Sequence, residues 1–577
     1  MPRVWRSPNS ATWVPLPSPT HSHEWLEADM VRPLLSPSVS PSKGRPTNPK
    51  VVVIGAGPAG LASLKELRGV GFDVTVYERR SDVGGIFTFD ADTSITSATP
   101  WTRSQLSKYV CPMTDFPFPN GKVPSHIRCM SVHVSSKEWS EYYRQYAKHF
   151  KLYEHIVFDT TIEVIKRDEI NSKWMVHIKG EIEPQVFDRV VFSSGSETVA
   201  MHPKIDDVHK FEGQFLHGQA YKSPADFKDK NIIVLGMGNS ACDTACELTE
   251  YAAKVYLAHR RGAKILPRAN EDGPLDSYVS WKISRMALWT EHHAPGIFQI
   301  LADGLLQKNS DSHFNGEEAE QYVEWGLEET SGDVTTIICN DHLKRLVHEK
   351  RIASVKGVKR VVGPRTVELD NGDIIEDVDA IIACTGYRAD FSLLPDLPST
   401  QLDASLPAFP DLYQMIFPPR YADSLACTNY CIINESAAAY RELQAMAIAQ
   451  VWAGNSVLPS QEAMTVQVNE YQTWLARQML TFPATMLGKG QMYPWMRWLH
   501  DTAGTGLYEY MSWSLKGTWF WLRNRRLYNL VAWGVYSPHI YRLFPTGKRS
   551  AWEGASQAII QVNEDRERAF PKKKGKT

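Results

Sequence analysis

The chain has no surplus of charge of either sign: its 577 residues carry a formal net charge of −2 at pH 7. A nucleic-acid-binding protein carries a basic surface, so we expect no nucleic-acid partner. No run of about 20 uncharged apolar residues occurs, so no membrane-spanning helix is predicted. The opening stretch lacks the apolar core of a signal peptide, and residues 1–48 are rich in proline and serine. We therefore expect a disordered N-terminus and an intracellular protein, cytoplasmic or loosely associated with a membrane surface and not secreted.

Cysteine motifs are equally scarce. The chain has eight cysteines, and none of them forms a C-x-x-C pair. Their scatter predicts reduced thiols and no disulfide framework. No H-E-x-x-H motif and no cluster of Cys and His predicts a metal site.

A glycine-rich turn is the first strong signal. In PKVVVIGAGPAGLASLKELRGVGFDVTVYERR, residues 49–80, a buried parallel strand feeds a G-x-G-x-x-G turn and a helix, and a second strand ends at Glu78. These glycines allow a tight turn, close approach to a pyrophosphate and packing of helix on strand, while the acid binds ribose hydroxyls. The predicted nucleotide site comprises Gly55, Ala56, Gly57, Pro58, Ala59, Gly60 and Glu78.

The same pattern returns in KNIIVLGMGNSACDTACELTEYAAKVYLAHRRG, residues 230–262, where the second strand ends in two arginines. An acid there would repel a ribose 2′-phosphate, whereas arginines bind one by charge-assisted hydrogen bonds. The pair therefore predicts NADPH at this site and an unphosphorylated ribose, as in FAD, at the first. The second site comprises Gly236, Gly238, Asn239, Ser240, Ala241, Cys242, Asp243, Arg260 and Arg261.

Two later apolar runs, DRVVFSSGS and DVDAIIACTGY, end in small residues and predict further strands of the first nucleotide domain, the second of them with Thr385 and Gly386 at its end. The predicted architecture is α/β, with two Rossmann-like dinucleotide-binding domains and the NADPH domain inserted in the FAD domain. The predicted limits are 49–224 and 336–455 for the FAD domain, 225–335 for the NADPH domain and 456–577 for an aromatic-rich, helical C-terminal region.

Between the two loops lies KFEGQFLHGQAYK, residues 210–222. Phe211, Gly213, His217 and Tyr221 match F-x-G-x-x-x-H-x-x-x-Y/F, so the chain resembles the flavin-containing monooxygenases, a family of class B flavoprotein monooxygenases. The related Baeyer–Villiger enzymes typically have Trp and then Pro or Asp at the motif's end, where this chain has Tyr and Lys. The resemblance favours a linker role for His217, which orients the two domains, over general acid/base catalysis.

Other segments resemble the family across roughly residues 50–455. DVGGIFTFD, residues 82–90, is similar to a Gly-Gly segment that lies near FAD, which implies contacts from Gly85, Ile86 and Phe87. MTDFPFP is similar to an Asp-Phe-Pro loop. Ten residues before that Asp the family has an Asn thought to order flavin, oxygen and NADP, whereas this chain has Gln105, followed by Leu106. The resemblance implies that Gln105 has a catalytic role with altered geometry, with Ser104 as the alternative.

The resemblance also implies a reaction. NADPH reduces FAD, a C4a-hydroperoxyflavin forms with O2, and one oxygen atom passes to a small organic substrate at nitrogen or sulfur. This step needs no Ser/His/Asp set, and the chain has none that we recognise. The narrower expectation is a role in secondary metabolite biosynthesis. No oligomeric state is predicted.

Three alternatives remain. Gln105 and the unmatched C-terminal region leave Baeyer–Villiger oxidation of a ketone, or epoxidation, as a second reaction. A pyridine nucleotide–disulfide reductase would need a redox cysteine pair near the flavin, and the sequence has none. An inactive flavin-binding scaffold is the non-enzymatic alternative, supported only by Gln105.

The C-terminal region 456–577 mixes Trp and Tyr with arginines, as in GTWFWLRNRRLYNLVAWGVYSPHIYRLF. A helical lid or packing layer explains this composition. The alternative is peripheral membrane contact, with aromatic residues on one face and basic residues on the other. The terminal PKKKGKT favours anionic lipid.

Overall fold

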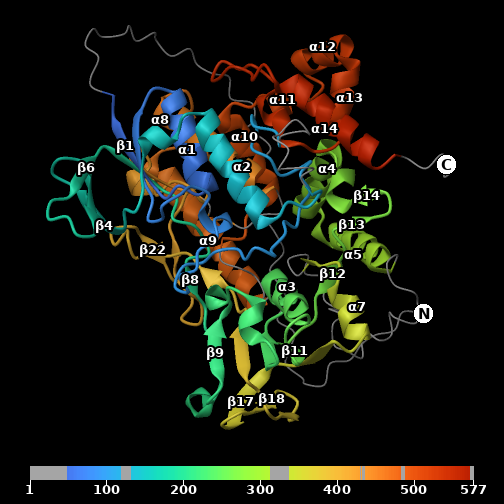
Figure 1. Cartoon of the computed structure of the whole chain (residues 1–577). Helices are drawn as coiled ribbons and strands as arrows, with labels where there is room; N and C mark the ends of the chain where they lie inside the picture. The colour runs from blue at the N-terminus through green and yellow to red at the C-terminus, as the bar shows by residue number, and fades with distance from the viewer. Residues whose placement is uncertain are drawn as a thin grey trace, which may run out of the picture. The chain divides into compact units, whose positions relative to one another are not determined.

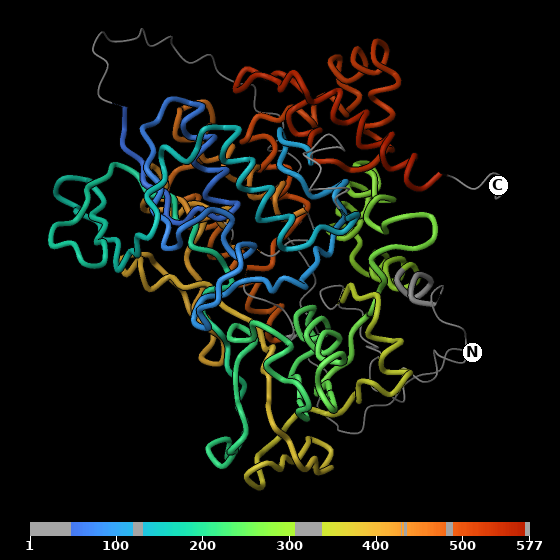
Figure 2. The backbone as a smooth tube through the Cα atoms, viewed as in Figure 1, coloured from blue at the N-terminus to red at the C-terminus, as the bar shows by residue number. Residues whose placement is uncertain are grey.

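The computed structural model describes residues 48–118, 131–311, 337–428, 430–431, 436–481 and 488–571. Within these residues no helix is both long enough and apolar enough to cross a membrane. Figure 1 shows the elements in sequence colours, and Figure 2 follows the same backbone as a tube. The predicted disordered N-terminus, residues 1–48, lies outside the described residues except for its last residue.

The first sheet is parallel, with strand order β24-β7-β1-β2-β3. Val52 of β1 pairs with Thr75 of β2 on one side and with Val190 of β7 on the other. Such a strand is buried on both faces, which explains its continuous β-branched run. The strands are β1 (Lys50–Ile54), β2 (Asp73–Tyr77), β3 (Ile156–Val157), β7 (Arg189–Phe192) and β24 (Leu425–Cys427).

The second sheet is also parallel, with order β16-β11-β10-β20-β9. Its central strand β10 carries the apolar run that the sequence predicted. The strands are β9 (Gln214–His217), β10 (Asn231–Leu235), β11 (Lys254–His259), β16 (Ile352–Lys356) and β20 (Ala380–Ala383). The prediction of an α/β fold with two Rossmann-like units is confirmed.

One strand was assigned to the wrong sheet. The run in DVDAIIACTGY forms β20, which was expected in the first sheet, but Ile381 pairs with Ile233 of β10 and with Phe215 of β9. Both sheets bury apolar parallel strands that end in small residues, so the sequence pattern does not reveal which sheet a strand joins. The second sheet thus draws strands from outside 225–335 and interrupts the first sheet between β7 and β24.

Helices cover the nucleotide turns as predicted. The helix α1 (Pro58–Gly69) follows β1, and α3 (Asn239–Leu248) follows β10. The helix α2 (Ser136–His149) begins with a reciprocal capping box between Ser135 and Glu138. The almost wholly buried α8 (Ala437–Trp452) packs directly against α1.

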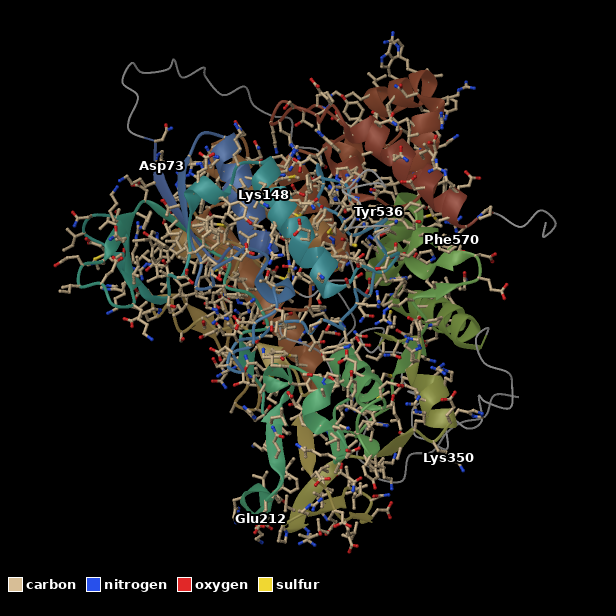
Figure 3. All side chains as sticks on the ribbon, viewed as in Figure 1. Asp73, Lys148, Glu212, Lys350, Tyr536 and Phe570 are labelled. Atoms are coloured by element: carbon tan, nitrogen blue, oxygen red, sulfur yellow. The ribbon has the colours of Figure 1, made fainter. Side chains whose placement is uncertain are left out.

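Short strands surround the two sheets. They are β4 (Ile162–Asp168), β5 (Lys173–Ile178) and β6 (Gln185–Phe187); β17 (Val358–Gly363), β18 (Thr366–Leu369) and β19 (Ile374–Ile375); and the pairs β8 (Val199–Ala200) with β21 (Tyr387–Arg388), β12 (Lys264–Leu266) with β15 (Ile337–Cys339), β13 (Ala269–Asn270) with β14 (Gly273–Pro274), and β22 (Ser399–Thr400) with β23 (Phe409–Pro410). Figure 3 labels Glu212 just before β9, where its backbone N–H donates to the carbonyl of Pro364 at 2.7 Å.

The C-terminal region is helical, as predicted, and it packs on earlier elements. Figure 1 shows the last four helices of this region, α11 to α14, in red near the green helix α4, and α4 contacts both α10 and α13. The remaining helices are α4 (Trp281–His293), α5 (Pro295–Asp311), α7 (Leu343–His348), α9 (Gln461–Thr481), α10 (Met492–Ala503), α11 (Leu507–Tyr510), α12 (Leu515–Arg523), α13 (Arg525–Trp533), the 3₁₀ turn η11 (Pro538–Arg542) and α14 (Ala555–Ala569).

Candidate cofactor and active site

The first glycine turn leaves no room for side chains. Gly55 has φ of +99°, and a Cβ there would lie 2.9 Å from the carbonyl oxygen of Ser193. A Cβ at Gly60 would lie 1.8 Å from the carbonyl oxygen of Gly55. Gly57 caps α1 without a side-chain hydrogen bond, so the first amides of the helix are left for a ligand. A helix N-terminus of this kind binds phosphate.

Glu78 lies directly after β2 and is buried. Its Oε2 accepts from the backbone N–H of Ala56 at 2.6 Å, and its Oε1 accepts from the N–H of Arg80 at 2.9 Å. The carboxylate is thereby held against the glycine turn with lone pairs to spare for hydroxyl groups. This is the geometry that binding of a ribose requires.

A pocket opens over this turn. Of the predicted residues, it is lined by Gly55, Gly57, Pro58, Ala59, Glu78, Gly85 and Ile86. Phe87 lies outside the lining and packs instead on Trp139, with ring centroids 5.3 Å apart. Ala56 and Gly60 do not line the pocket but stabilise the turn beneath it. The N–H of Ala56 donates to Glu78, and Gly60 lies against Gly55.

The second turn repeats this geometry. Gly236 has φ of +132°, and a Cβ there would lie 2.5 Å from the carbonyl oxygen of Cys384. Gly238 caps α3 without a side-chain hydrogen bond. Ala241 is buried, and its Cβ would lie 3.6 Å from a Cβ at Gly236, so a small side chain fills the place of the third glycine. Asn239 accepts from the N–H of Cys339 at 3.1 Å.

Arg260 and Arg261 follow β11 directly and are exposed. Among the described residues no ion pair involves either guanidinium. They come at the carboxyl end of the strand beside β10, which is where ligands bind in sheets of this kind. Two unpaired cations at this position fit a ribose 2′-phosphate.

The other predicted residues have different surroundings. Asp243 accepts from Arg268 at 3.4 Å and from Asn340 at 2.8 Å. Cys242 is buried in the core beneath the sheet, while Ser240 is exposed on the first turn of α3. Thr385 and Gly386 follow β20, so they lie beside the second glycine turn rather than in the pocket over the first.

The segment that contains the motif, residues 210–222, makes hydrogen bonds to residues beside the first pocket. His217 ends β9 and is buried, and its Nδ1 accepts from the N–H of Gln219 at 3.1 Å. Burial, followed by the neighbouring His202, lowers the pKa of His217. Gln219 donates to Thr96 of the first pocket at 2.7 Å, and Lys222 donates to the carbonyl of Ile95 at 2.8 Å.

Gln105 does not line the first pocket. Its Oε1 is buried and has no hydrogen-bond partner in the part of the chain that the structure describes. A buried polar atom without a partner calls for an explanation, such as a catalytic role or an ordered water, and several other side chains of this protein share the property. Leu106 packs beside it in a small cluster with Tyr109 and Val110. Ser104 donates its Oγ–H to the carbonyl of Leu106 at 2.6 Å, so that hydroxyl is already engaged.

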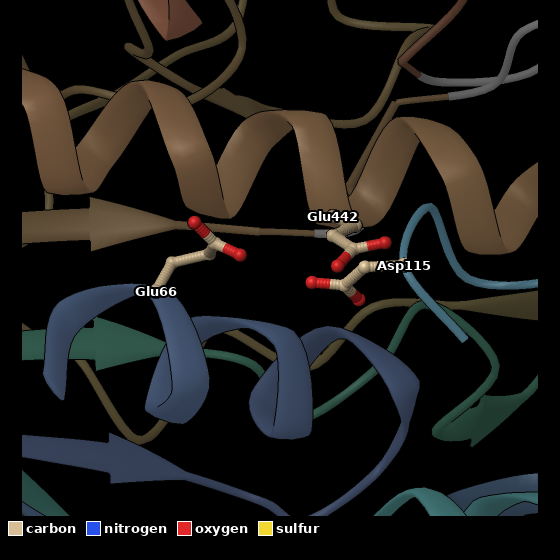
Figure 4. Close-up of side chains that lie close together, drawn as sticks. All are labelled: Glu66, Asp115 and Glu442. Atoms are coloured by element: carbon tan, nitrogen blue, oxygen red, sulfur yellow. The ribbon is translucent and has the colours of Figure 1, made fainter. Parts of the chain in front are cut away.

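Three carboxylates, on Glu66, Asp115 and Glu442, lie close together between α1 and α8 (Figure 4). Two cations pair with them: Lys65 pairs with Asp115 at 2.7 Å and also with Glu442, and Arg542 pairs with Glu66 and with Glu442. Burial raises the pKa of Glu442, but Lys65 and Arg542 outweigh it and hold that pKa below its usual range. The cluster is a buried ion-pair network.

Comparison with known proteins decides what these two nucleotide turns belong to. A family model described as flavin-binding monooxygenase-like matches residues 48–574. This chain belongs to the flavin-binding monooxygenase-like family.

Individual relatives agree with this assignment. Monooxygenase aurF of Gibberella zeae is 33% identical over 542 residues, which cover 91% of this chain and 99% of the relative. Among solved structures, S-allyl-L-cysteine S-oxygenase from Allium sativum matches with a TM-score of 0.57 and 19% identity, over 90% of this chain and 99% of that one. A closed structure of cyclohexanone monooxygenase matches with a TM-score of 0.58 and 14% identity, over 80% and 98%. The two structures show the shared fold.

Sequence reasoning missed several residues of this flavin monooxygenase. Arg80 is buried and donates to the carbonyls of Thr88 at 2.8 Å and Thr96 at 2.6 Å, so it shapes the wall of the pocket over the first turn. Arg441 on α8 lines the same pocket. The place of Arg80, two positions after Glu78 in the sequence, was a signal for the first. Nothing in the sequence around α8 indicated the second, because the pocket forms only when α8 packs on α1.

Proposed function

We propose that this flavin-binding monooxygenase uses FAD and NADPH to transfer one oxygen atom from O2 to a small organic substrate. The difference between the two nucleotide turns carries the proposal. The first strand pair ends in a buried carboxylate that is held against the turn, and the second ends in two exposed arginines that form no ion pair with any described residue. A carboxylate suits the free ribose of FAD, and arginines suit the 2′-phosphate of NADPH.

The chain's own groups have separable tasks. The amides at the start of α1 bind the FAD pyrophosphate, and Glu78 orients its ribose. The turn at Gly236 and Gly238 binds the pyrophosphate of NADPH. When bound, the flavin supplies the hydride acceptor and the site at which oxygen is activated. The protein orients the two cofactors and excludes water.

His217 acts in this scheme as a positioning residue. Its lowered pKa keeps the imidazole neutral at pH 7, and its Nδ1 fixes the turn that carries Gln219. Gln219 in turn holds Thr96 beside the first pocket. We assign His217 to the orientation of one nucleotide unit against the other.

The substrate class that we favour is a soft nitrogen or sulfur atom, because oxygen transfer to such atoms needs no catalytic acid. The name of the relative from Allium sativum, an S-oxygenase, agrees with this choice. Baeyer–Villiger oxidation of a ketone, or epoxidation, is the second candidate, favoured by Gln105 at the place of the family's Asn and by the likeness to cyclohexanone monooxygenase. Intermediates of secondary metabolism therefore belong in any substrate panel.

One experiment tests the proposal. The purified protein should be yellow, should release FAD on denaturation and should oxidise NADPH faster than NADH in the presence of O2. Mass spectrometry should then detect a gain of one oxygen in an amine, a sulfide or a ketone from the panel. A folded protein that stays colourless with added FAD would refute the cofactor assignment. A yellow protein that never oxidises NADPH would instead support an inactive flavin-binding scaffold.

We also infer that the C-terminal helices contact an anionic membrane surface. Trp513 and Leu515 are 93% and 92% exposed, and Trp519 on α12 is exposed as well. Arg523 stacks over Trp519 with 4.0 Å between its guanidinium carbon and the ring centre, and Arg525 stacks over Trp521 at 5.0 Å. Exposed aromatic residues beside cations fit the boundary between lipid headgroups and acyl chains.

A further inference from the structure

The segment that carries Gln105 is held by hydrogen bonds to residues nearby in the sequence and to a distant part of the chain. The N–H of Ser104 donates to the carbonyl of Val134 at 2.8 Å, and the N–H of Lys108 donates to that of Val132 at 2.8 Å. Both ties join the segment to the chain that leads into α2. They leave residues 105–107 as a short arch between them.

A third tie comes from the second nucleotide unit. Asp276 lies just after the β13–β14 hairpin, at the start of the 3₁₀ turn η8 (Leu275–Tyr278). Its Oδ2 accepts from the backbone N–H of Ser107 at 2.5 Å, and its Oδ1 accepts from the Ser107 hydroxyl at 2.8 Å. Ser107 is completely buried. One carboxylate therefore engages both donors of the residue two positions after Gln105.

Asp276 is itself held firmly. The N–H of Leu275 donates to the carbonyl of Arg268 at 3.1 Å. Arg268 is buried, and its guanidinium binds Asp341 at 2.9 Å and Asp243 of α3 at 3.4 Å. Since α3 is the helix that starts at the second glycine turn, a continuous series of contacts joins that turn to the Gln105 arch.

The C-terminal helix α14 contacts the other side of the β13–β14 hairpin. Arg566 of α14 donates to the carbonyl of Asp272 on the hairpin at 3.1 Å. Phe570, labelled in Figure 3, packs over the hairpin: a Cβ at Gly273 would lie 3.1 Å from its ring. Phe570 also packs with Leu106 around Tyr109. The hairpin is thus held between α14 and the Gln105 arch.

We propose that Asp276 is a positioning residue for Gln105: it holds the backbone at Ser107 so that the buried carboxamide keeps one place. This inference rests on the proposed function, together with the role in oxygen transfer that the family resemblance implies for Gln105. Burial raises the pKa of Asp276, which agrees with a carboxylate enclosed between two segments. A positioned group that shifts by 1 Å can lose about 10² in rate.

The variants separate this role from a general loss of folding. Asp276→Ala removes both acceptors, Asp276→Asn keeps one acceptor oxygen, and Ser107→Ala removes one of the two donors. The matched control is Asp272→Asn, because Asp272 lies on the same hairpin and is exposed. Flavin content and melting temperature are checked first for every variant.

The first readout does not depend on activity. Hydrogen–deuterium exchange of the peptide around residues 104–111, measured on the protein as purified, should rise at least several-fold in Asp276→Ala. The increase should be smaller in Asp276→Asn and absent in Asp272→Asn. Unchanged exchange at this peptide in Asp276→Ala would overturn the proposal, whether or not the protein oxidises NADPH.

The second readout tests the action through Gln105. NADPH oxidation is followed together with hydrogen peroxide release, which needs no identified substrate. Asp276→Ala should raise the peroxide released per NADPH, and Asp276→Asn should restore part of the coupling. In the background of Gln105→Ala, the same substitution should add nothing, because non-additivity reports a shared role. Independent, multiplying effects would overturn the proposal. Wild-type peroxide release in Gln105→Ala itself would instead count against the proposed role of Gln105.

Discussion

Gln105 has a buried carboxamide oxygen without a partner among the described residues. If it orders the oxygen-transfer step, Gln105→Ala should leave flavin binding and NADPH-driven reduction nearly unchanged, because those depend on the two glycine turns. The loss should fall on oxygen transfer, on the order of 10²–10³ in rate. The measurement is the amount of hydrogen peroxide released relative to the amount of oxygenated product formed.

Gln105→Asn provides the comparison for this prediction. It restores the amide of the family's typical Asn but shortens its reach. Retention of wild-type coupling in Gln105→Ala would show that the side chain only fills space. Ser104 is then a poor replacement, because its hydroxyl already donates to the carbonyl of Leu106 at 2.6 Å.

Glu247 predicts a dependence of stability on pH. It lies on α3, where the hydroxyl of Tyr221 donates to it at 3.2 Å, and burial together with Asp243 raises its pKa to about 7. A carboxyl with a raised pKa in the folded state stabilises the fold below its ordinary pKa, and this contribution is lost as the pH rises through 7. Ionised Glu247 therefore costs stability at pH 8.

Glu247→Gln should remove that cost and keep an acceptor for Tyr221. We expect a higher melting temperature than wild type at pH 8, which corresponds to a gain in the free energy of unfolding on the order of 1–3 kcal/mol, and little difference at pH 5. Glu250→Gln, at an exposed position just after α3, is the control. An equal gain at both pH values would contradict a titration at this site.

At the scale of elements, β11 should set the choice of nicotinamide cofactor through the arginines at its end. Replacing Arg260 and Arg261 with Ala should raise the KM for NADPH about tenfold or more, since a hydrogen bond to a charged group contributes about 1.5–3 kcal/mol. The KM for NADH should barely change. Lys254→Ala, exposed at the other end of β11, is the control. Equal effects on both cofactors would refute a 2′-phosphate contact.

The ion-pair network between α1 and α8 should control stability. Arg542 of η11 pairs with Glu442 of α8 at 2.8 Å and with Glu66 of α1. Arg542→Met would leave three buried carboxylates with fewer cations, and breaking such a pair costs about 3–5 kcal/mol. The melting temperature should fall strongly, with or without added flavin.

An exposed ion pair provides the control for this network. Arg526 pairs with Glu564 at 2.9 Å on the surface of the C-terminal region. Arg526→Met should cost no more than about 1 kcal/mol. Similar losses of stability in both variants would mean that burial does not increase the contribution of this network.

On the scale of the whole molecule, the C-terminal region has two faces with different tasks. Its inner face joins the flavin unit through Arg542 and the Gln105 segment through Phe570. Its outer face exposes Trp513, Leu515 and Trp519. The triple replacement of these three by Ser should reduce co-sedimentation with vesicles that contain phosphatidylserine, while NADPH oxidation stays unchanged.

Two controls make this test specific. Ile170 and Ile182 are each 93% exposed and lie away from α12, beside β4–β6, so their replacement by Ser should leave vesicle binding intact. Vesicles of neutral lipid should bind less protein than anionic ones. Equal binding of the wild type and the triple variant to anionic vesicles would exclude this surface as the contact.

Local sequence determined the two nucleotide turns almost completely. The requirement for glycine at Gly55 and Gly236, the helices that follow and the charge at each strand end are all consequences of short-range sterics and spacing. Those elements appear in the structure where the sequence predicted them. The helix at 136–149 was equally predictable, because its periodicity and its capping box are local.

Contacts between distant segments were decided only by the tertiary structure. The strand β20 joins the second sheet, Arg441 enters the first pocket from α8, and Asp276 reaches Ser107 across 169 positions. An apolar strand with small residues at its end suits either sheet, and a lone carboxylate in a loop has many potential partners. Long-range pairing is selected by the packing of the whole chain. The turns could therefore be predicted from the sequence, whereas the strand partners and the surroundings of Gln105 could not.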